Sequence, residues 1–416
     1  MADFFTINRE TIGAKLRRLS REARRNNPWV NGVMSSPPTI TAATTPTITA
    51  SAGTATNYLL KNANGQAAIR TFGGVRTPLF TDYMNFPVAT ISATLSGGNI
   101  SGDGRPGNQN ATSFQAEFMA DAANVSVAFL NSAAPVRFLV EGPETGGKLQ
   151  YVSTTGTVVN VGGGTGYANI PFASRALRRI VVEGEQAQAV VGVTVAATEG
   201  VYATEGSDIL RGFYIGASFA EGTGATRVND NTANVMMGAL GIRDRRCSGL
   251  GGTGFVQSVS GTKYTFGQRL PIDAVMNGPF DVAFIRASFN DNGLSGIQAA
   301  ADATLRIFRA AYARVPLSVL GCTSGNYGPD AATLAVEAAV SAAVTAFADP
   351  LTIFVPSASD SPPSVSGTGK VGATNTTGNS DLYVSGSANP HYATAGHIYD
   401  GLRGADALMA KLSLLP

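Results

Sequence analysis

Several positions in the second half of the chain carry residue types that together could act on an ester. Ser218 follows a short apolar run at 213–215, where a hydroxyl can serve as a nucleophile. A backbone N–H near Gly251 and the amide of Asn290 can donate hydrogen bonds to a developing oxyanion. The sequence contains 2 histidines, so a histidine base must be His391 or His397.

Each of these signals also has an ordinary structural explanation. The glycine-rich run at 249–254 and the Asn-Asp-Asn-Gly sequence at 290–293 are typical of turns. A serine after a strand, or a histidine that caps or packs, needs no catalytic role. The signals gain weight from their order along the chain and from their positions at the ends of expected elements.

Buried strands alternate with helices after residue 204, which predicts an α/β domain over 204–416 with a doubly wound parallel sheet. In such sheets ligands bind at the carboxyl ends of the strands, where Ser218 stands. The expected strands are 211–217, 281–286, 315–320 and 351–355, and the expected helices are 297–312, 330–348 and 394–413.

Apolar residues alternate with polar ones over much of 61–203, and glycine-rich turns separate the runs. This period of two predicts an all-β sandwich, jelly-roll-like, in front of the α/β domain. Two interpretations of this domain stay open, a structural spacer and a glycan-binding module.

The first 60 residues differ in character from the rest. Residues 8–26 have an apolar helical stripe and a basic opposite face, which predicts an amphipathic helix within a docking segment, 1–30. The basic face is either a solvated surface or a contact with a partner assembly. Residues 31–60 are rich in Pro, Thr and Ala and predict a linker, so we expect 1–30 to be dispensable for folding.

Composition limits the possible functions. The formal net charge is +2, which gives no bulk attraction to nucleic acid. Two cysteines, Cys247 and Cys322, are expected to be buried apolar residues, and with so few thiols and imidazoles we expect no metal site. We find no secretory signal and no apolar run long enough to span a membrane.

From about residue 205 onward the chain resembles the SGNH (GDSL-type) hydrolases, whose motif blocks occur here in the family's order. Ser218 matches the family's nucleophile, and Asn290 matches its oxyanion asparagine. The oxyanion glycine is Gly251 or Gly252, and His391 matches the base through the spacing His-x-x-x-Ala-Gly-His. The resemblance implies a flavodoxin-like sheet and an esterase that needs no cofactor.

Two departures from the family's pattern stand out. Gly-Asp-Ser is Gly-Ala217-Ser here, and the carboxylate expected three residues before His391 is Ala388. His391 would then be oriented by a backbone carbonyl, by Asn389 or by Asp381. We therefore expect either a slow Ser–His dyad or no activity.

Residues 172–183 resemble the end of the jelly-roll module that precedes the catalytic domain in two-domain carbohydrate esterases. With a docking helix and a tether in front, the architecture resembles bacteriophage tail or fibre proteins. The leading hypothesis is a virion protein, made in the host cytoplasm, that deacylates a host surface glycan. Its expected partners are other virion proteins, through residues 1–30, and further copies of itself. The alternative is a decayed SGNH fold with a structural or receptor-binding role. A cytoplasmic esterase would leave the basic helix unexplained.

Overall fold

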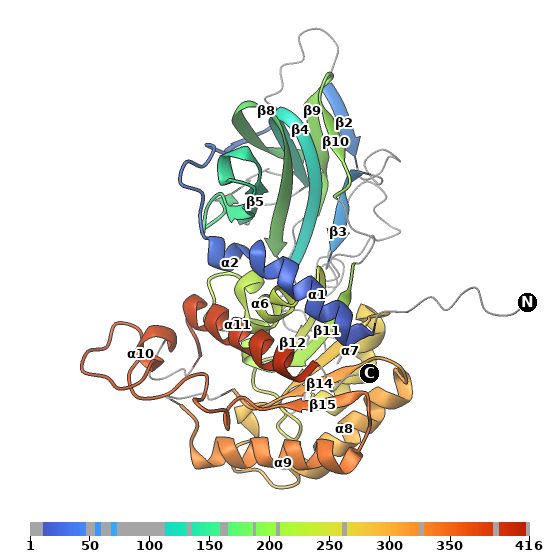
Figure 1. Ribbon diagram of the computed structural model, residues 1–416, viewed down its shortest axis with the longest axis vertical. Coiled ribbons are helices and arrows are strands. Elements are labelled where there is room, and N and C mark those ends of the chain that lie inside the picture. Colours follow the sequence, from blue (N-terminus) through green and yellow to red (C-terminus); the bar gives the residue numbers. More distant parts are fainter. Residues whose placement is uncertain are drawn as a thin grey trace, which may run out of the picture.

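The computed structural model describes residues 11–46, 55–59, 68–72, 113–130, 135–158, 165–185, 189–204, 209–259, 264–323, 328–385 and 391–412. Two bodies lie end to end, an antiparallel β domain and an α/β domain, and a helix crosses the waist between them (Figure 1).

The α/β domain is built on a five-stranded parallel sheet in the order β12-β11-β13-β14-β15. Numbered along the chain this order is 2-1-3-4-5, the flavodoxin-like arrangement, in which the crossovers change direction between β11 and β13. The strands are β11 (Arg211–Gly216), β12 (Asp244–Gly249), β13 (Val282–Arg286), β14 (Leu317–Leu320) and β15 (Thr352–Val355).

Helices cover both faces of this sheet, because successive strand residues point to opposite sides and both sets are apolar. Phe213 and Ile215 of β11 join one buried cluster, and Tyr214 joins the other. On the first face lie α7 (Phe266–Asn277), α8 (Ile297–Ala311) and α9 (Ala331–Phe347). On the second lie α1 (Ile12–Arg25), α6 (Thr232–Ala239) and α11 (Thr394–Lys411). The short helices are α2 (Pro28–Asn31), α5 (Ser218–Glu221) and α10 (Ser380–Tyr383), with 3₁₀ turns at η2 (Pro143–Thr145), η3 (Val228–Asp230) and η4 (Phe289–Asp291).

Strand β12 is not among the strands that the sequence predicts. Its sequence, Asp-Arg-Arg-Cys-Ser-Gly, is too polar to look like a buried strand, yet every residue in it is buried. Local ion pairs compensate the charges: Asp244 accepts hydrogen bonds from Arg211 at 2.5 Å and from Arg246 at 2.7 Å. Both cysteines are buried, as expected.

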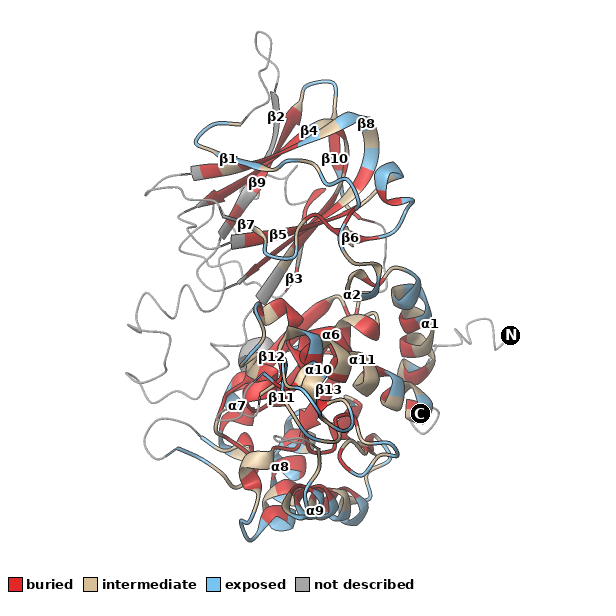
Figure 2. Ribbon diagram, turned by 90° about the vertical axis from the view of Figure 1, so that its left-hand side faces the viewer, coloured by how far each residue is buried: buried red, intermediate tan, exposed pale blue. Residues whose placement is uncertain are grey.

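In its described residues the β domain forms an antiparallel sheet of 10 strands, with its main apolar core on one face (Figure 2). Its strands are β1 (Thr41–Ala43), β2 (Ala55–Leu59), β3 (Arg70–Phe72), β4 (Ser113–Leu130), β5 (Pro135–Glu141), β6 (Gln150–Tyr151), β7 (Thr157–Val158), β8 (Thr165–Glu185), β9 (Ala189–Ala196) and β10 (Gly200–Tyr202). Strands β4 and β8 are long and pair along their whole length, with a register shift between Ala122 and Asn124. The alternating runs predicted as separate strands at 114–118 and 125–129 are thus one strand.

The expected linker is partly structural. Residues 41–43 pair with β8, and 55–59 pair with β9. Met34 is buried in the core of the β domain, and its N–H donates to the Tyr151 carbonyl at 2.8 Å. The Pro/Thr composition indicated a lack of apolar core, but strand pairing needs only backbone groups. The rest of 47–67 lies largely outside the described residues.

Helix α1 forms where predicted, but its apolar stripe packs against its own chain. Leu16 has 0% exposure and belongs to the cluster built by α6 and α11. The Ser20 hydroxyl donates to the Ala239 carbonyl at 2.9 Å, and Arg24 pairs with Asp406. The expectation that 1–30 is dispensable for folding assumed a separate helix, and for the described part of this segment that assumption is wrong.

A buried charge cluster joins the two domains. Arg137 of β5 donates two hydrogen bonds to Asp230 of η3, at 2.7 and 2.8 Å, and a third to Glu183 of β8 at 2.9 Å. The indole N–H of Trp29 also donates to Asp230, at 2.9 Å. Directional bonds between buried groups fix the relative orientation of the domains better than apolar contact alone would.

Shortening Leu16 tests whether α1 is part of the fold. Leu16→Ala should lower the free energy of unfolding by about 2–5 kcal/mol, because it opens a cavity in a closed apolar cluster. Urea denaturation followed by circular dichroism measures the change, with Arg21→Ala on the exposed face of the same helix as the control. Equal stability of both variants would show that α1 does not pack as described.

Candidate active site

Ser218 stands at the turn from β11 into α5, at the point where the strand order reverses. It is the first residue of α5 and is 4% exposed. The buried guanidinium of Arg269 donates to the Gly216 carbonyl and, at 3.1 Å, to the Ser248 hydroxyl. The strand end that presents Ser218 is therefore held from beneath by a side chain of α7.

His391 reaches Ser218 from the far end of the sequence. Its Nε2 lies 2.7 Å from Ser218 Oγ, the distance of a good hydrogen bond. The segment that carries His391 can lie this close to residue 224 because residue 224 is glycine. A Cβ on Gly224 would collide with the Tyr392 carbonyl and would lie 3.4 Å from Cβ of His391. Gly224 also has φ +92°, a conformation that favours glycine.

Aromatic rings surround the imidazole of His391. Phe219 lies 5.4 Å from it between ring centroids, and Phe289 lies 6.3 Å away. Burial by these rings lowers the pKa of His391 below its ordinary value. At neutral pH the ring is therefore neutral and can accept the Ser218 proton.

The glycine loop after β12 lies beside the nucleophile. A Cβ on Gly251 would lie 3.4 Å from Cβ of Ser218 and would collide with Glu221. The Gly251 N–H donates to Oε2 of Glu221 at 2.6 Å, so this donor is occupied. Among the described contacts the N–H of Gly252, where φ is +78°, has no acceptor. Of the two glycines that the sequence left open, Gly252 is therefore the one whose N–H is still available as a donor among these contacts.

Asn290 and Asp291 tie the end of β13 to the same loop. Nδ2 of Asn290 donates to the Thr253 carbonyl at 3.0 Å, which leaves its second amide hydrogen for a ligand. The Asp291 carboxylate accepts the N–H groups of residues 255, 256 and 257, at 2.8, 3.1 and 2.8 Å. The loop is thus held by side chains on α5 and η4.

His397 lies within α11, in the helix where it was expected, and both of its ring nitrogens contact threonines rather than Ser218. Its Nε2 lies 3.0 Å from the Thr223 carbonyl, and its Nδ1 lies 3.1 Å from the Thr232 hydroxyl. The Thr232 N–H also points at Nδ1, at 3.3 Å. Because Nδ1 accepts a hydrogen bond while Nε2–H donates one, the His397 ring must be neutral. Burial favours this neutral form and lowers the pKa of His397 to about 4.

The sequence left open which group orients His391 in place of the acid of a catalytic triad. Ala388 and Asn389 lie outside the described residues, and the contacts of the described residues include no hydrogen bond between Asp381 and His391. Ala217, at the position of the other missing aspartate, is buried in an apolar cluster. The described residues therefore show the contact between Ser218 and His391 and no bond from Asp381 to the imidazole.

The sequence proposed Ser218, His391, Asn290 and the glycine pair, and the structure brings them to one edge of the sheet. It missed Glu221 and Asp291, which hold the glycine loop. The available signal for Glu221 was its position one helical turn after Ser218, while Asp291 was interpreted as part of a turn. No cluster of metal-binding side chains and no helix able to cross a membrane occurs within the described residues.

Removing the Glu221 carboxylate should slow acylation of Ser218. Glu221→Ala frees the loop, and we expect labelling of Ser218 by a fluorophosphonate to slow by about 10–100-fold, because small displacements of donors are costly. Glu221→Gln keeps an acceptor and should retain most of the rate. An unchanged rate in Glu221→Ala would show that the loop needs no such anchor.

The neutral state of His397 predicts a pH-dependent stability. The unfolded chain binds a proton near pH 6.5, but the folded protein binds it only near pH 4, where the pKa is about 4. The free energy of unfolding should therefore fall as pH drops from 6.5 towards 4, by up to ~1.4 kcal/mol per pH unit from this group. His397→Gln should lose this part of the slope, measured by urea titrations at several pH values. Parallel slopes for the two proteins would contradict the assignment.

Comparison with known proteins shows the fold. Neither a family model nor a curated protein sequence matches this chain. Among solved structures, the salicylyl-acyltransferase SsfX3 from a tetracycline biosynthetic pathway is similar over 84% of this chain and 96% of its own, with a TM-score of 0.56 and 13% identity.

Two esterases are similar over most of their length. A family two carbohydrate esterase from Cellvibrio japonicus covers 91% of this chain and 100% of its own, with a TM-score of 0.53 and 9% identity. The acetyl xylan esterase Est2A from Butyrivibrio proteoclasticus covers 87% and 99%, with a TM-score of 0.52 and 11% identity. The chain therefore has the fold of SGNH-type esterases and acyltransferases, including the domain in front of the parallel sheet.

Proposed function

We propose that this protein is an SGNH-type ester hydrolase that removes acyl groups from a polysaccharide. The observation that carries the proposal is the 2.7 Å contact between Ser218 Oγ and His391 Nε2 at the switch point of a parallel sheet. Burial of His391 supports it, because it keeps the base neutral.

The proposed mechanism assigns a residue to each step of acyl transfer. Ser218 Oγ attacks the ester carbonyl while His391 Nε2 takes its proton, and the Gly252 N–H and the Asn290 amide stabilise the oxyanion. Collapse breaks the ester bond, and the imidazolium gives its proton to the departing sugar oxygen. Water, deprotonated by the same nitrogen, then attacks the acyl-serine. As the acyl–serine bond breaks, the imidazolium returns that proton to Ser218 Oγ, which releases the acid and restores the enzyme.

The polysaccharide is proposed by analogy with the carbohydrate esterases of similar fold. The virion setting, assembly through the N-terminal segment and self-association are likewise proposals, supported by the order of the domains. Of the N-terminal helix, the basic face is exposed at Arg21, Arg24 and Arg25, whereas the apolar stripe is covered. A receptor-binding role without catalysis is the second candidate, and Ala388 favours it.

Installing the missing acid separates the two candidates. A carboxylate near the imidazole orients it and stabilises its charged form, and its loss in a serine protease costs ~10⁴ in rate. Ala388→Asp should therefore raise the turnover of p-nitrophenyl acetate and of an acetylated glycan by at least about tenfold. Ser218→Ala should abolish turnover without unfolding the protein.

Ala388→Asn is the matched control, because it adds similar volume without charge. If wild type and Ala388→Asp both stay at the level of Ser218→Ala, the hydrolase proposal fails and the receptor-binding role replaces it.

A further inference from the structure

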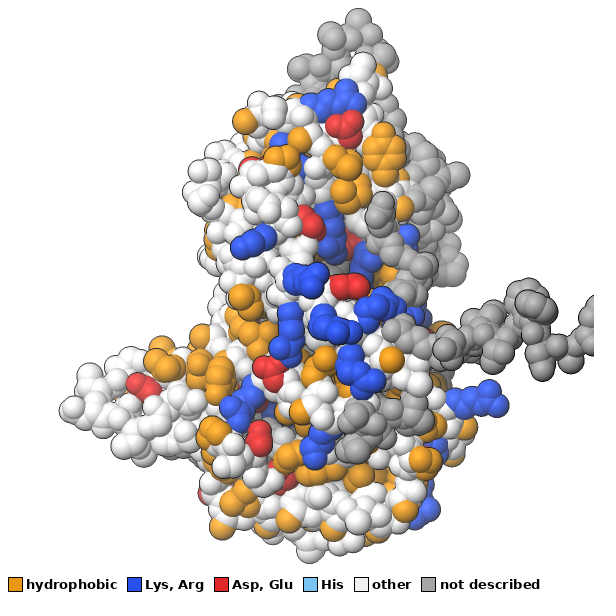
Figure 3. Space-filling model, viewed as in Figure 1, with side chains coloured by type: hydrophobic (Ala, Val, Ile, Leu, Met, Phe, Trp, Pro, Cys, Tyr) orange, Lys and Arg blue, Asp and Glu red, His pale blue; other side chains and the backbone are white. Residues whose placement is uncertain are grey.

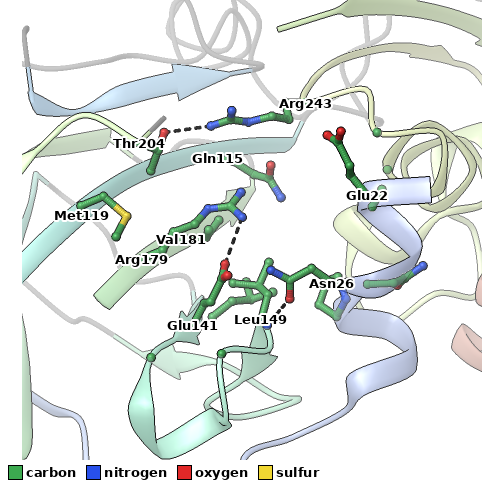
Figure 4. A pocket seen from close by; sticks show the side chains of 18 of the residues that line it. Glu22, Asn26, Gln115, Met119, Glu141, Leu149, Arg179, Val181, Thr204 and Arg243 are labelled. Atoms are coloured by element: carbon green, nitrogen blue, oxygen red, sulfur yellow. Dashed lines mark hydrogen bonds and ion pairs between the residues drawn. The ribbon is translucent and has the colours of Figure 1, made fainter. Parts of the chain in front are cut away.

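A large cavity lies between the two domains, away from Ser218. Its volume is about 1310 Å³, above the ~300–1,000 Å³ of ordinary small-molecule sites. It lies between the outer face of the β domain, helices α1 and α2, and the connection from α6 to β12 (Figure 4). No residue of the Ser218–His391 site lines it.

The cavity lies at the opposite edge of the parallel sheet from the nucleophile. The lining residues of the α/β domain run from Gly238 to Arg245, at the start of β12, whereas Ser218 follows Gly216, which pairs with the last residue of β12. The six residues of β12, which separate the cavity from the nucleophile, span about 20 Å. Ligands of the two sites would therefore not compete for the same space.

The sheet wall of the cavity is an ordered row of side chains. Tyr202 pairs with Met119, Met119 with Arg179, and Arg179 with Glu141, so these four share one face across β10, β4, β8 and β5. Neighbouring strands are ~4.8 Å apart, so the row is about 14 Å long. Leu177 lies on the same face, two residues from Arg179.

The row offers two kinds of contact to one ligand. Tyr202 is 54% exposed and Leu177 is 55% exposed, unusual for side chains of their size. Beside them are planar polar groups: Arg179 donates to Glu117 at 2.8 Å and to Glu141 at 3.3 Å, so the guanidinium supplies donors and the Glu141 carboxylate supplies acceptors. Sugar rings have apolar faces and hydroxyl edges, and they fit such a surface. The open sheet face, unlike a sheet edge, offers no backbone pairing to a peptide.

Positive charge outweighs negative charge on the helix that forms the opposite rim. Arg18 and Glu22 of α1 line the cavity and pair at 3.8 Å, while Arg21 and Arg25 are not lining residues but lie on exposed positions of the same helix. Neither Arg21 nor Arg25 has an ion-pair partner among the residues that the structure describes. Figure 3 shows Lys and Arg side chains gathered across the waist of the molecule. Guanidinium groups pair well with carboxylates, so the rim favours an acidic chain.

We propose that the cavity between the domains binds a stretch of acidic, uronate-bearing polysaccharide. Tyr202 and Leu177 contact the ring faces, Arg179 and Glu141 bond the hydroxyls, and Arg21 and Arg25 attract the carboxylates. The site holds the polymer and takes no part in ester cleavage.

The test is calorimetric titration of the full wild-type chain with short oligogalacturonate, which carries no ester and so reports binding alone. We expect saturable binding that weakens as salt rises. Tyr202→Ala and Leu177→Ala should each weaken it about tenfold, as for typical anchor residues. The matched control Leu334→Ala, on α9, should bind like wild type. Arg21→Gln should weaken binding and reduce its salt dependence, whereas Arg314→Gln, another exposed arginine, should not.

Failure to bind oligogalacturonate at low salt overturns the proposal. So does equal binding of a neutral cello-oligosaccharide, or of poly-glutamate through the same residues, which would indicate a different ligand class. Hydrolysis of p-nitrophenyl acetate by the cavity variants should equal that of wild type. Hydrolysis is measured independently of binding. Failure of the hydrolase proposal would therefore leave the polysaccharide-binding proposal standing, and failure of the binding proposal would leave the hydrolase proposal standing.

Discussion

A buried ion pair between β13 and α11 holds the two halves of the candidate active site together. The two terminal nitrogens of the Arg286 guanidinium, Nη1 and Nη2, each lie 3.0 Å from the carboxylate of Asp400, and both side chains are almost excluded from solvent. Breaking such a pair from one side costs about 3–5 kcal/mol, because a charge stays buried without compensation. Asn290 follows Arg286 in the chain, and His391 precedes α11. The position of the base relative to the oxyanion loop therefore depends on this contact.

Carboxylates also hold the loops around Ser218. Loops leave backbone N–H groups without partners, and here buried carboxylates accept them. Asp291 accepts those of the glycine loop, and Glu337 accepts those of Cys322 and Ala358 at the ends of β14 and β15. Glu221 does so for Gly251. These hydrogen bonds order the carboxyl edge of the sheet, and preorganised donors are what oxyanion stabilisation needs.

Much of this arrangement could be predicted from residue order. Apolar runs located four of the strands in the parallel sheet, and motif spacing selected Ser218, Asn290 and His391. Strand β12 could not be found, because its charges are compensated only by side chains brought near in the fold. The amphipathic stripe of α1 indicated that some surface covers it, but periodicity cannot say whether that surface belongs to the same chain. The role of Glu221 was hidden for the same reason, since its partner is a backbone group of a distant loop.

The packing of α1 on α11 also constrains how the chain reaches its native state. Leu16 shares a cluster with Leu408 and Leu412, which are made last among the described residues. At about 5–20 residues per second, a ribosome needs about 20–80 s between these positions. Throughout that interval the apolar stripe of α1 lacks its final partners and is a target for chaperones or aggregation. A contact of such high sequence separation also places the closure of the α/β domain late in folding.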